Sequence, residues 1–194
     1  MIELQYIVLV GVVISLWGTF SYIKETIRGN TKPNRVTWLL WSVSPMIAVA
    51  AAISNGVTWA VLPVFMSGFG PFLVFVASFF NKNSYWRLRL FDYLCGFLSI
   101  MALIAWGLTK DPNIAIILAI TSDGLAATPT LVKFWRYPET ETVEAYVAGF
   151  LNASTSFFAI KAWNFSSYAF PTYLIFLNAC FVLCFLRGKF IKST

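Results

Sequence analysis

The sequence predicts an all-α membrane protein in which seven helices cross the bilayer and are joined by short turns. Of the 194 residues, 59% are hydrophobic and only 11% are charged, and the mean hydropathy is +0.74. A soluble domain of this length would carry far more charge on its surface. The apolar residues form seven runs of about 20 residues, the length that a spanning helix needs. The basic residues fall mainly into every second turn between these runs.

The seven apolar runs use up nearly the whole chain. We expect helices over residues 5–26, 36–54, 57–80, 88–109, 113–135, 143–162 and 168–187. Basic residues concentrate after the first, third and fifth runs and in the C-terminal tail. By the positive-inside rule, this pattern and an odd number of crossings place the N-terminus outside and the C-terminus in the cytoplasm. We therefore expect a multi-pass protein of the cell (plasma or inner) membrane.

Composition also argues against several classes of function. The net charge is +6, but the basic residues lie in short turns rather than on one face, so we expect no nucleic-acid partner. The chain has no histidine, the commonest metal ligand and general base. Its acidic residues are scattered over different depths, which leaves no carboxylate pair for catalysis. We therefore expect no enzyme, no catalytic residue, no metal and no cofactor.

The chain contains a weak internal repeat with a shift of 108 positions. The shift aligns Ser15 with Asp123, Tyr22 with Thr130, Arg28 with Arg136, Trp38 with Tyr146, Ser44 with Asn152, Pro63 with Pro171 and Gly70 with Asn178. The first three runs also match the last three in length, turn length and turn charge. We expect a 3+1+3 plan: a first three-helix repeat over 1–80, a linker helix over 81–110, and a second repeat with a short basic tail over 111–194. A single linking helix gives the two repeats the same orientation, so they are parallel.

The turn after the first run carries a recognisable motif. Tyr22–Gly29, Pro33 and Thr37–Trp41 resemble the end of a PQ-loop helix, its basic turn and the start of the next helix. The second copy has Pro129 near the position of the family's Pro-Gln pair. With the 3+1+3 plan, the chain resembles the SWEET and PQ-loop transporter superfamily, which includes SemiSWEET-like and nicotinamide riboside transporter-like relatives. The chain departs from the motif in two ways: Ser21 replaces the proline of the first copy, and neither copy has the glutamine.

Depth along the helices predicts where a solute would bind. At a rise of about 1.5 Å per residue, roughly ten residues reach the centre of the hydrocarbon core. Asp123, Asn152 and Asn178 reach this depth in the last three runs, and their repeat mates do so in the first three. Polar groups are costly in lipid and should face the bundle interior. The expected substrate-binding residues are Asp123, Asn152, Asn178, Ser44, Ser15, Trp38 and Trp41.

Each of these residues also has a structural interpretation. Trp38 and Trp41 are either a stacking platform for a planar solute, as paired tryptophans are in the nicotinamide riboside transporters, or part of an interfacial aromatic belt. Asn152 and Asn178 contact a ligand or form interhelical hydrogen bonds. Asp123 is a proton-coupling group or a counter-ion for a cationic solute, because burial disfavours a charged carboxylate. Otherwise it is a structural carboxyl bonded to a neighbour such as Ser122 or Thr121.

Prolines and acidic residues add two further expectations. Proline removes a helix hydrogen bond, so prolines inside spans act as hinges or as fixed kinks. The expected hinges are Pro45, Pro63, Pro129 and Pro171. Glu139, Glu141 and Glu144 follow Pro138 and suit a helix N-terminus. Alternatively, they pair with the basic turn of the first repeat and form a cytoplasmic gate.

The leading interpretation is a transporter of a small polar solute: a sugar, an amino acid or a vitamin-like nucleoside. It works by alternating access, with proton coupling through Asp123 left open, and without ATP, since no phosphate-binding glycine-lysine motif occurs. The alternative is a non-retinal seven-helix membrane sensor or assembly factor; a retinal protein needs a lysine in the last run, which has none. The expected partners are the solute and the lipid bilayer, and a homo-oligomer is left open.

Overall fold

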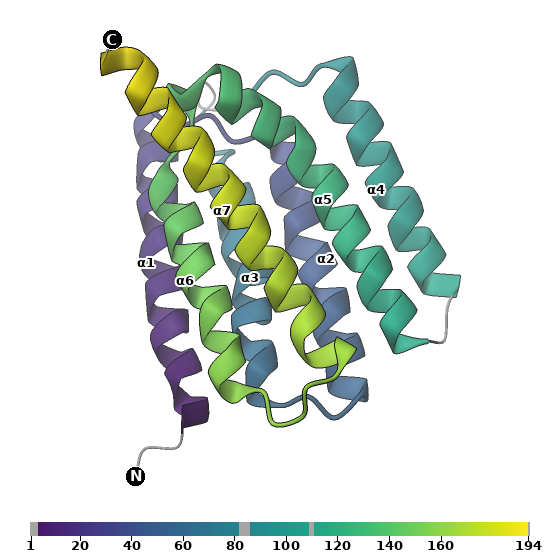
Figure 1. The fold of residues 1–194 in the computed structure, drawn as a ribbon. Helices are drawn as coiled ribbons and strands as arrows, with labels where there is room; N and C mark the ends of the chain where they lie inside the picture. The colour runs from purple at the N-terminus through teal and green to yellow at the C-terminus, as the bar shows by residue number, and fades with distance from the viewer. Residues whose placement is uncertain (1–3, 82–85, 109–110, 194) are drawn as a thin grey trace.

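The computed structural model describes residues 4–81, 86–108 and 111–193, and in this part of the chain it is all-α, without strands. The predicted seven helices are confirmed for the described residues. They are α1 Ile7–Arg28, α2 Arg35–Ser54, α3 Leu62–Ala77, α4 Leu90–Leu108, α5 Pro112–Arg136, α6 Val143–Ala159 and α7 Phe165–Ser193 (Figure 1). Three short 3-10 helices, η1 Leu4–Tyr6, η2 Trp59–Val61 and η3 Pro138–Thr140, lie in the connections.

Local side-chain chemistry sets several helix ends. The Asn34 side chain accepts hydrogen bonds from the first backbone N–H groups of α2, and Asp111 does the same for α5. Gly29 ends α1 in the left-handed region at φ 89°, which glycine adopts without strain. α7 runs on to Ser193, well past its predicted end at residue 187, and the other main difference from the predicted bounds is in α3. It begins at Leu62 rather than near residue 57, because η2 occupies the preceding residues.

Five helical stretches are long and apolar enough to cross a membrane, which indicates a multi-pass membrane protein. They are Leu4–Arg28, Arg35–Ser54, Trp59–Ala77, Pro112–Arg136 and Phe165–Lys189. The other two helices are shorter by the same measure: α6 has 17 residues, and the apolar part of α4 runs over Leu90–Ala105.

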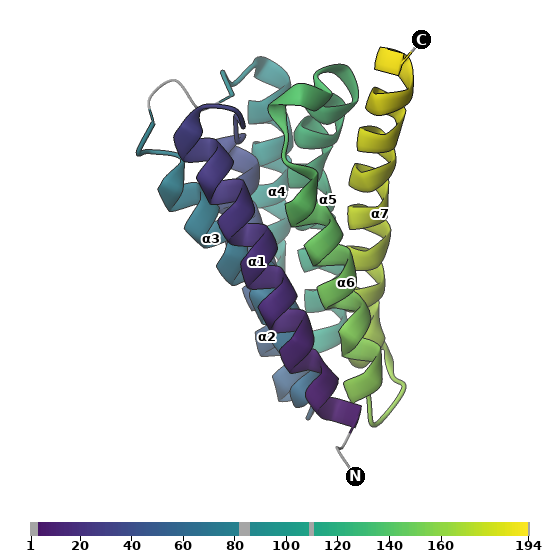
Figure 2. The ribbon, with the colours of Figure 1, turned by 90° about the vertical axis from the view of Figure 1, so that its left-hand side faces the viewer.

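Six of the helices form a closed ring. Going round it, α1 packs against α6, α6 against α7, α7 against α5, α5 against α2, α2 against α3, and α3 back against α1. α4 lies outside the ring, against α5 (Figures 1 and 2). Exchanging α1 with α5, α2 with α6 and α3 with α7 leaves this set of packed pairs unchanged. The ring therefore has the contact pattern of two equivalent three-helix units, α1–α3 and α5–α7.

α1 packs closely against α6 because two glycines of α1 face α6. A Cβ added to Gly11 would lie 2.4 Å from Thr155 Oγ1, and one added to Gly18 would lie 2.4 Å from the Ala148 Cβ. Small residues at such positions let membrane helices approach each other. In the equivalent α5–α2 interface, the corresponding positions 108 residues later are Ala119 and Ala126, which are also fully buried.

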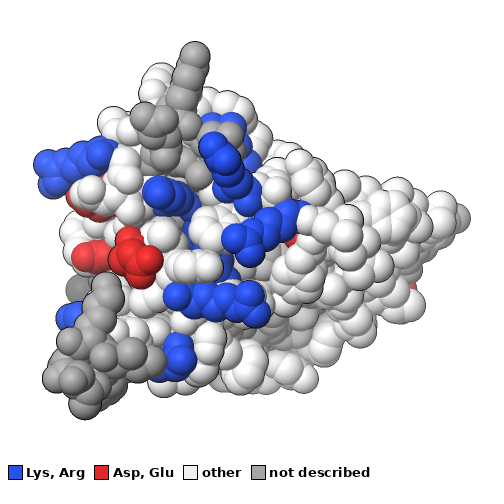
Figure 3. All heavy atoms as spheres, turned by 90° about the horizontal axis from the view of Figure 1, so that it is seen from above, with Lys and Arg blue, Asp and Glu red and all other residues white. Residues whose placement is uncertain are grey.

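Charge separates the two ends of the bundle. We call the end that holds the α1–α2 turn, the start of α4, the α5–α6 turn and the C-terminus of α7 the basic end. Viewed onto this end, Lys and Arg side chains are spread across the surface, with few acidic ones among them (Figure 3). Lys161 lies in the turn between α6 and α7, at the opposite end. The core is aromatic toward the basic end and rich in alanine toward the opposite end.

Candidate functional site

A cavity of about 80 Å³ lies inside the six-helix ring, and every helix of the ring contributes to its wall. This space exceeds what a single water molecule needs. Its polar lining comes from Ser15, Thr19, Ser67, Asp123, Asn152 and Asn178. Its aromatic lining comes from Trp38, Trp41, Tyr146 and Phe181. No lysine or arginine is among the lining residues, so the side chain of Asp123 is the only acidic or basic group in the described wall.

Most of the predicted substrate-binding residues meet in this cavity. Those that line it are Ser15, Trp38, Trp41, Asp123, Asn152 and Asn178. Ser44 does not line it. Its hydroxyl is fully buried between α2 and α5, 3.1 Å from the Leu40 carbonyl oxygen and 3.2 Å from Ser122 Oγ. Ser44 therefore serves helix packing in this structure.

The cavity extends across both three-helix units. Pairs of residues 108 positions apart line it from opposite sides: Ser15 and Asp123, Trp38 and Tyr146, Trp41 and Gly149, Met66 and Leu174, and Gly70 and Asn178. The shift found in the sequence thus relates residues that face one common space. Tyr146 was missed as a site residue, although its alignment with Trp38 was a signal for it.

Asp123 has a carboxyl group with unequal surroundings. Its Oδ2 accepts a hydrogen bond of 2.8 Å from the Tyr173 hydroxyl, and its backbone oxygen accepts one of 3.2 Å from Trp41 Nε1. Its Oδ1 is buried without a hydrogen-bond partner among the described residues, and the residue is 2% exposed. Neither expected neighbour holds the carboxyl: Ser122 Oγ pairs with Ser44, and Thr121 bonds the Ile117 carbonyl. A buried acceptor of this kind suits a ligand that donates a hydrogen bond or carries a positive charge.

The two asparagines take part in packing as well as lining the cavity. Asn152 Nδ2 donates a 2.8 Å bond to the Pro63 carbonyl at the start of α3, which is an interhelical hydrogen bond. Asn178 Nδ2 donates a 2.8 Å bond to the Leu174 carbonyl of its own helix. A Cβ added to Gly149 would lie 2.6 Å from Asn178 Oδ1, so glycine allows this amide to fit between α6 and α7.

Trp38 and Trp41 lie in the interior, and the interpretation as an interfacial belt is wrong for them. They are 4% and 7% exposed and meet edge to face with ring centroids 5.3 Å apart. Trp41 in turn contacts Phe181 edge to face at 5.7 Å, and Phe181 stacks on Tyr146 at 4.2 Å. These rings form a continuous aromatic wall on the side of the cavity toward the basic end.

The prolines fall into two groups. Pro45, Pro129 and Pro171 lie inside α2, α5 and α7, as predicted. Pro63 lies inside the apolar stretch Trp59–Ala77, as predicted, but in the first turn of α3, where proline removes no helix hydrogen bond. Pro71, which the sequence reasoning missed, lies inside α3 and lines the cavity.

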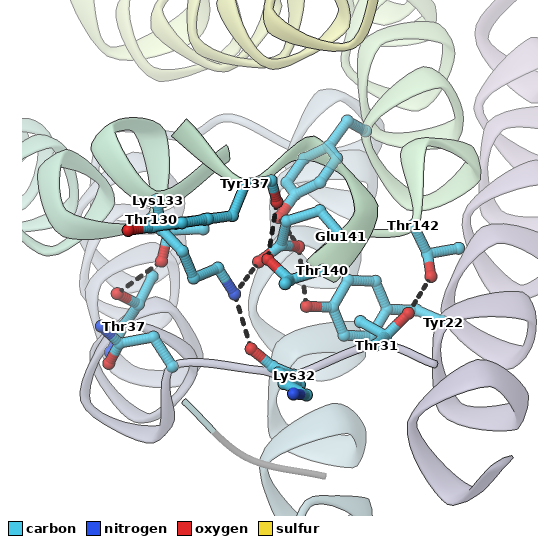
Figure 4. A network of polar contacts seen from close by, with 12 residues as sticks. Tyr22, Thr31, Lys32, Thr37, Thr130, Lys133, Tyr137, Thr140, Glu141 and Thr142 are labelled. Carbon is cyan, nitrogen blue, oxygen red and sulfur yellow. Dashed lines mark hydrogen bonds and ion pairs between the residues drawn. The ribbon is translucent and has the colours of Figure 1, made fainter. Parts of the chain in front are cut away.

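A buried polar cluster lies between the cavity and the basic end. We call Tyr22, Lys133, Glu141 and Tyr146 the Lys133–Glu141 cluster; Tyr22, Lys133 and Glu141 are labelled in Figure 4. Lys133 Nζ and Glu141 Oε1 form an ion pair whose side chains are 1% and 0% exposed. Glu141 Oε2 accepts hydrogen bonds from the Tyr22 hydroxyl at 2.8 Å and the Tyr146 hydroxyl at 2.7 Å.

Further hydrogen bonds around this cluster join the α1–α2 turn to the α5–α6 turn. Lys133 Nζ donates to the Lys32 carbonyl at 2.5 Å, and the Lys32 backbone N–H donates to the Thr140 carbonyl at 3.0 Å. The hydroxyls of Thr31 and Thr142 also pair. For Glu141, the alternative of an ion pair with the basic turn of the first repeat is therefore wrong in its partner. Glu141 pairs with Lys133 of its own unit and reaches the other unit through Tyr22 (Figure 4).

No group of three His, Cys, Asp or Glu side chains in the described ranges is placed to hold a metal ion. Comparison of the chain with models of protein families, with curated proteins and with solved structures finds no match. The functional argument therefore rests on the cavity and the cluster above it.

Proposed function

We propose that the protein is a transporter that moves a small polar solute across the cell membrane by alternating access. The observation that carries this proposal is the cavity inside the six-helix ring, with an unpartnered carboxyl oxygen of Asp123 in its wall. An ionisable group inside a membrane bundle is costly and typically marks a substrate or ion pathway. Transporters built from repeats bind their substrates near the middle of the membrane, between the repeats.

In this proposal all seven helices cross the membrane, with the basic end in the cytoplasm and the N-terminus outside. The 17 residues of α6 rise about 25 Å, close to the thickness of the hydrocarbon core. α6 also packs along α1 and α7, both of which are long enough to span. The Lys and Arg side chains gathered at one end support this orientation (Figure 3).

The two transport units are residues 1–80 and 111–194, linked by the helix within 81–110. The exchange pattern of the ring contacts and the paired residues around the cavity support two parallel repeats. This plan also keeps the resemblance to the SWEET and PQ-loop superfamily within the proposal. The prolines inside α2, α5 and α7 are suitable hinges for rocking one unit against the other, because each removes one helix hydrogen bond.

The wall of the cavity favours a solute with a cationic or strongly hydrogen-bonding group. No basic side chain balances Asp123, so the carboxyl is best accommodated either when it binds a proton or when a cationic group lies beside it. Trp41, Tyr146 and Phe181 provide an aromatic wall for the body of the solute, and aromatic rings also attract cations. Proton coupling through Asp123 follows if a proton and the solute use the same carboxyl.

A thermal-shift screen of the purified protein against sugars, amino acids and vitamin-like nucleosides tests this proposal. A ligand at a hundredfold excess over its Kd stabilises the native state by about 2.7 kcal/mol. We expect one solute class to raise the unfolding temperature, and Asp123→Asn and Asn178→Ala to abolish that shift. Ser44→Ala is the matched control, since Ser44 lies outside the cavity and its variant should keep the shift.

Uptake of the same solute into proteoliposomes then distinguishes a transporter from a receptor. Solute-specific uptake that Asp123→Asn abolishes supports transport through the cavity. A thermal shift without any uptake, under a solute gradient and under a pH gradient, contradicts the proposal and favours a seven-helix sensor. The absence of a shift across the panel contradicts it as well and favours an assembly factor.

A further inference from the structure

We propose that the Lys133–Glu141 cluster is the gate that closes the cavity toward the basic end, and that it opens by hydration of its ion pair. This inference rests on the proposed function, because it assigns the regulation of access to the same cavity. It concerns four side chains with no direct part in binding the solute, except for the ring of Tyr146.

The cluster forms a layer immediately beyond the cavity. Tyr146 belongs to both: its ring lines the cavity and its hydroxyl donates to Glu141 Oε2. The Tyr22 ring packs against Trp38, which also lines the cavity, with ring centroids 4.5 Å apart and the ring planes tilted by 53°. Lys133 is ten residues beyond Asp123 along α5, about 15 Å nearer to the basic end. A solute leaving toward the basic end therefore has to pass this layer.

The cluster also joins the two three-helix units, as a gate must. The Tyr22 hydroxyl of α1 is bonded to Glu141, which precedes α6. Lys133 of α5 is bonded to the Lys32 carbonyl in the α1–α2 turn. If the units rock apart at the basic end, both bonds must break (Figure 4). They do not need to break for motions within either unit.

The ion pair gives the closed layer a physical means of opening. The free energy lost by removing two charges from water nearly equals the free energy gained from their attraction and hydrogen bonds. A buried ion pair therefore adds little net stability. When the basic end opens, water hydrates Lys133 and Glu141 and offsets the lost contacts. An apolar layer would gain nothing from that water. The charged pair therefore keeps the closed and open arrangements close in free energy, as a two-state gate requires.

Access of a thiol reagent to the cavity tests the gate without any knowledge of the solute. The protein carries Ser15→Cys as the reporter, with Cys95, Cys180 and Cys184 replaced by alanine, in membrane vesicles of both orientations. A membrane-impermeant maleimide is applied from the side of the basic end or from the other side, and the labelling rate of the reporter is measured.

Two changes should move the labelling rate in opposite directions. Tyr22→Phe removes one hydrogen bond to Glu141 from the closed layer, so labelling from the basic end should rise about tenfold. Lys133→Met combined with Glu141→Gln removes both charges but keeps an oxygen for the two tyrosine hydroxyls. Without the gain from hydration, this double variant should open less and be labelled more slowly than the parent.

The control is Tyr137→Phe, which makes the same chemical change at an exposed tyrosine that packs on Trp86 outside the cluster. It should leave the rate unchanged, and labelling from the opposite side should not rise in Tyr22→Phe. If Tyr22→Phe labels at the rate of Tyr137→Phe while thermal unfolding shows it folded, the gate is wrong. That result leaves the transporter proposal standing, since the solute-dependent thermal shift tests the cavity independently of access.

Discussion

The two three-helix units occupy equivalent places in the ring but carry different chemistry. At equivalent positions the first unit has Ser15, Glu25, Pro33, Phe65 and Gly70, and the second has Asp123, Lys133, Glu141, Tyr173 and Asn178. The first unit thus lacks the cavity carboxyl, the tyrosine that holds it and both members of the buried ion pair. This comparison shows that equivalent places in the ring do not require equivalent side-chain chemistry. Both units line the cavity with equal numbers of residues, but the carboxyl group and the two amide side chains of the described wall all come from the second unit.

The variant with the largest expected effect on stability removes one member of the ion pair. Lys133→Met strands the Glu141 carboxylate in a buried layer, which should cost about 3–5 kcal/mol of unfolding free energy. Adding Glu141→Gln should recover most of this loss. The equivalent change in the first unit, Glu25→Gln, affects a partly exposed pair with Arg28 and should have no measurable effect.

Denaturant unfolding of the purified variants in detergent measures these differences. Equal losses for Lys133→Met and Glu25→Gln would mean that the two positions are energetically alike, contrary to the comparison. A double variant as unstable as Lys133→Met would mean that the loss comes from the lysine's own packing rather than from the stranded carboxylate.

A substitution with an intermediate expected effect on the unfolding free energy makes the second unit resemble the first at one position. Tyr173→Phe introduces the residue that the first unit has at the equivalent position, and it removes the only hydrogen bond to the Asp123 side chain in the described structure. We expect a loss of about 1–2 kcal/mol, because the carboxyl is left without a partner. Combined with Asp123→Asn the change should cost less, since an amide carries no charge to stabilise. A double-mutant cycle on unfolding free energies measures this coupling, and strictly additive losses would contradict it.

Much of the architecture follows from the sequence because the bilayer restricts it. Helix number and approximate bounds came from apolar runs and turn charges, since a spanning segment must be both long and apolar. The depth of the polar residues was also informative. Asp123, Asn152 and Asn178 lie on three different helices, yet all three reach the same cavity.

Depth did not determine the direction in which a side chain points. Ser44 is at the right height but faces Ser122 in the α2–α5 interface, because successive helical residues point about 100° apart. Trp38 and Trp41 of the aromatic wall were predicted, but its other two rings were missed for a related reason. Phe181 and Tyr146 are interior, but their residue types are equally common on helix faces that contact lipid. In an apolar helix, the periodicity of hydrophobic residues does not distinguish the interior face from the lipid-contacting face.

The Lys133–Glu141 pair could not be predicted from sequence for another reason. Charges near helix ends in a membrane protein normally reach the interface, and Lys133 and Glu141 occur at such ends. They are buried only because the α1–α2 and α5–α6 turns fold over each other, through the Lys32 and Thr140 backbone and the Thr31 and Thr142 hydroxyls. Contact between turns about 108 residues apart leaves no local pattern in either segment.

The smallest expected effect concerns Ser44 and its equivalent, Asn152. Ser44→Ala removes a neutral hydrogen bond between α2 and α5, and such bonds in membrane proteins contribute about 0.6 kcal/mol on average. Asn152→Ala removes the bond to the Pro63 carbonyl and also alters the cavity wall. We therefore expect both to lower the unfolding free energy slightly, and only Asn152→Ala to weaken the solute-dependent thermal shift. If Ser44→Ala weakens that shift as much, Ser44 contacts the solute in a second arrangement of the helices. The two units would then bind the solute in different arrangements of the helices. The chemical difference between them at the cavity would be a property of the conformation described here and would not hold for every conformation of the protein.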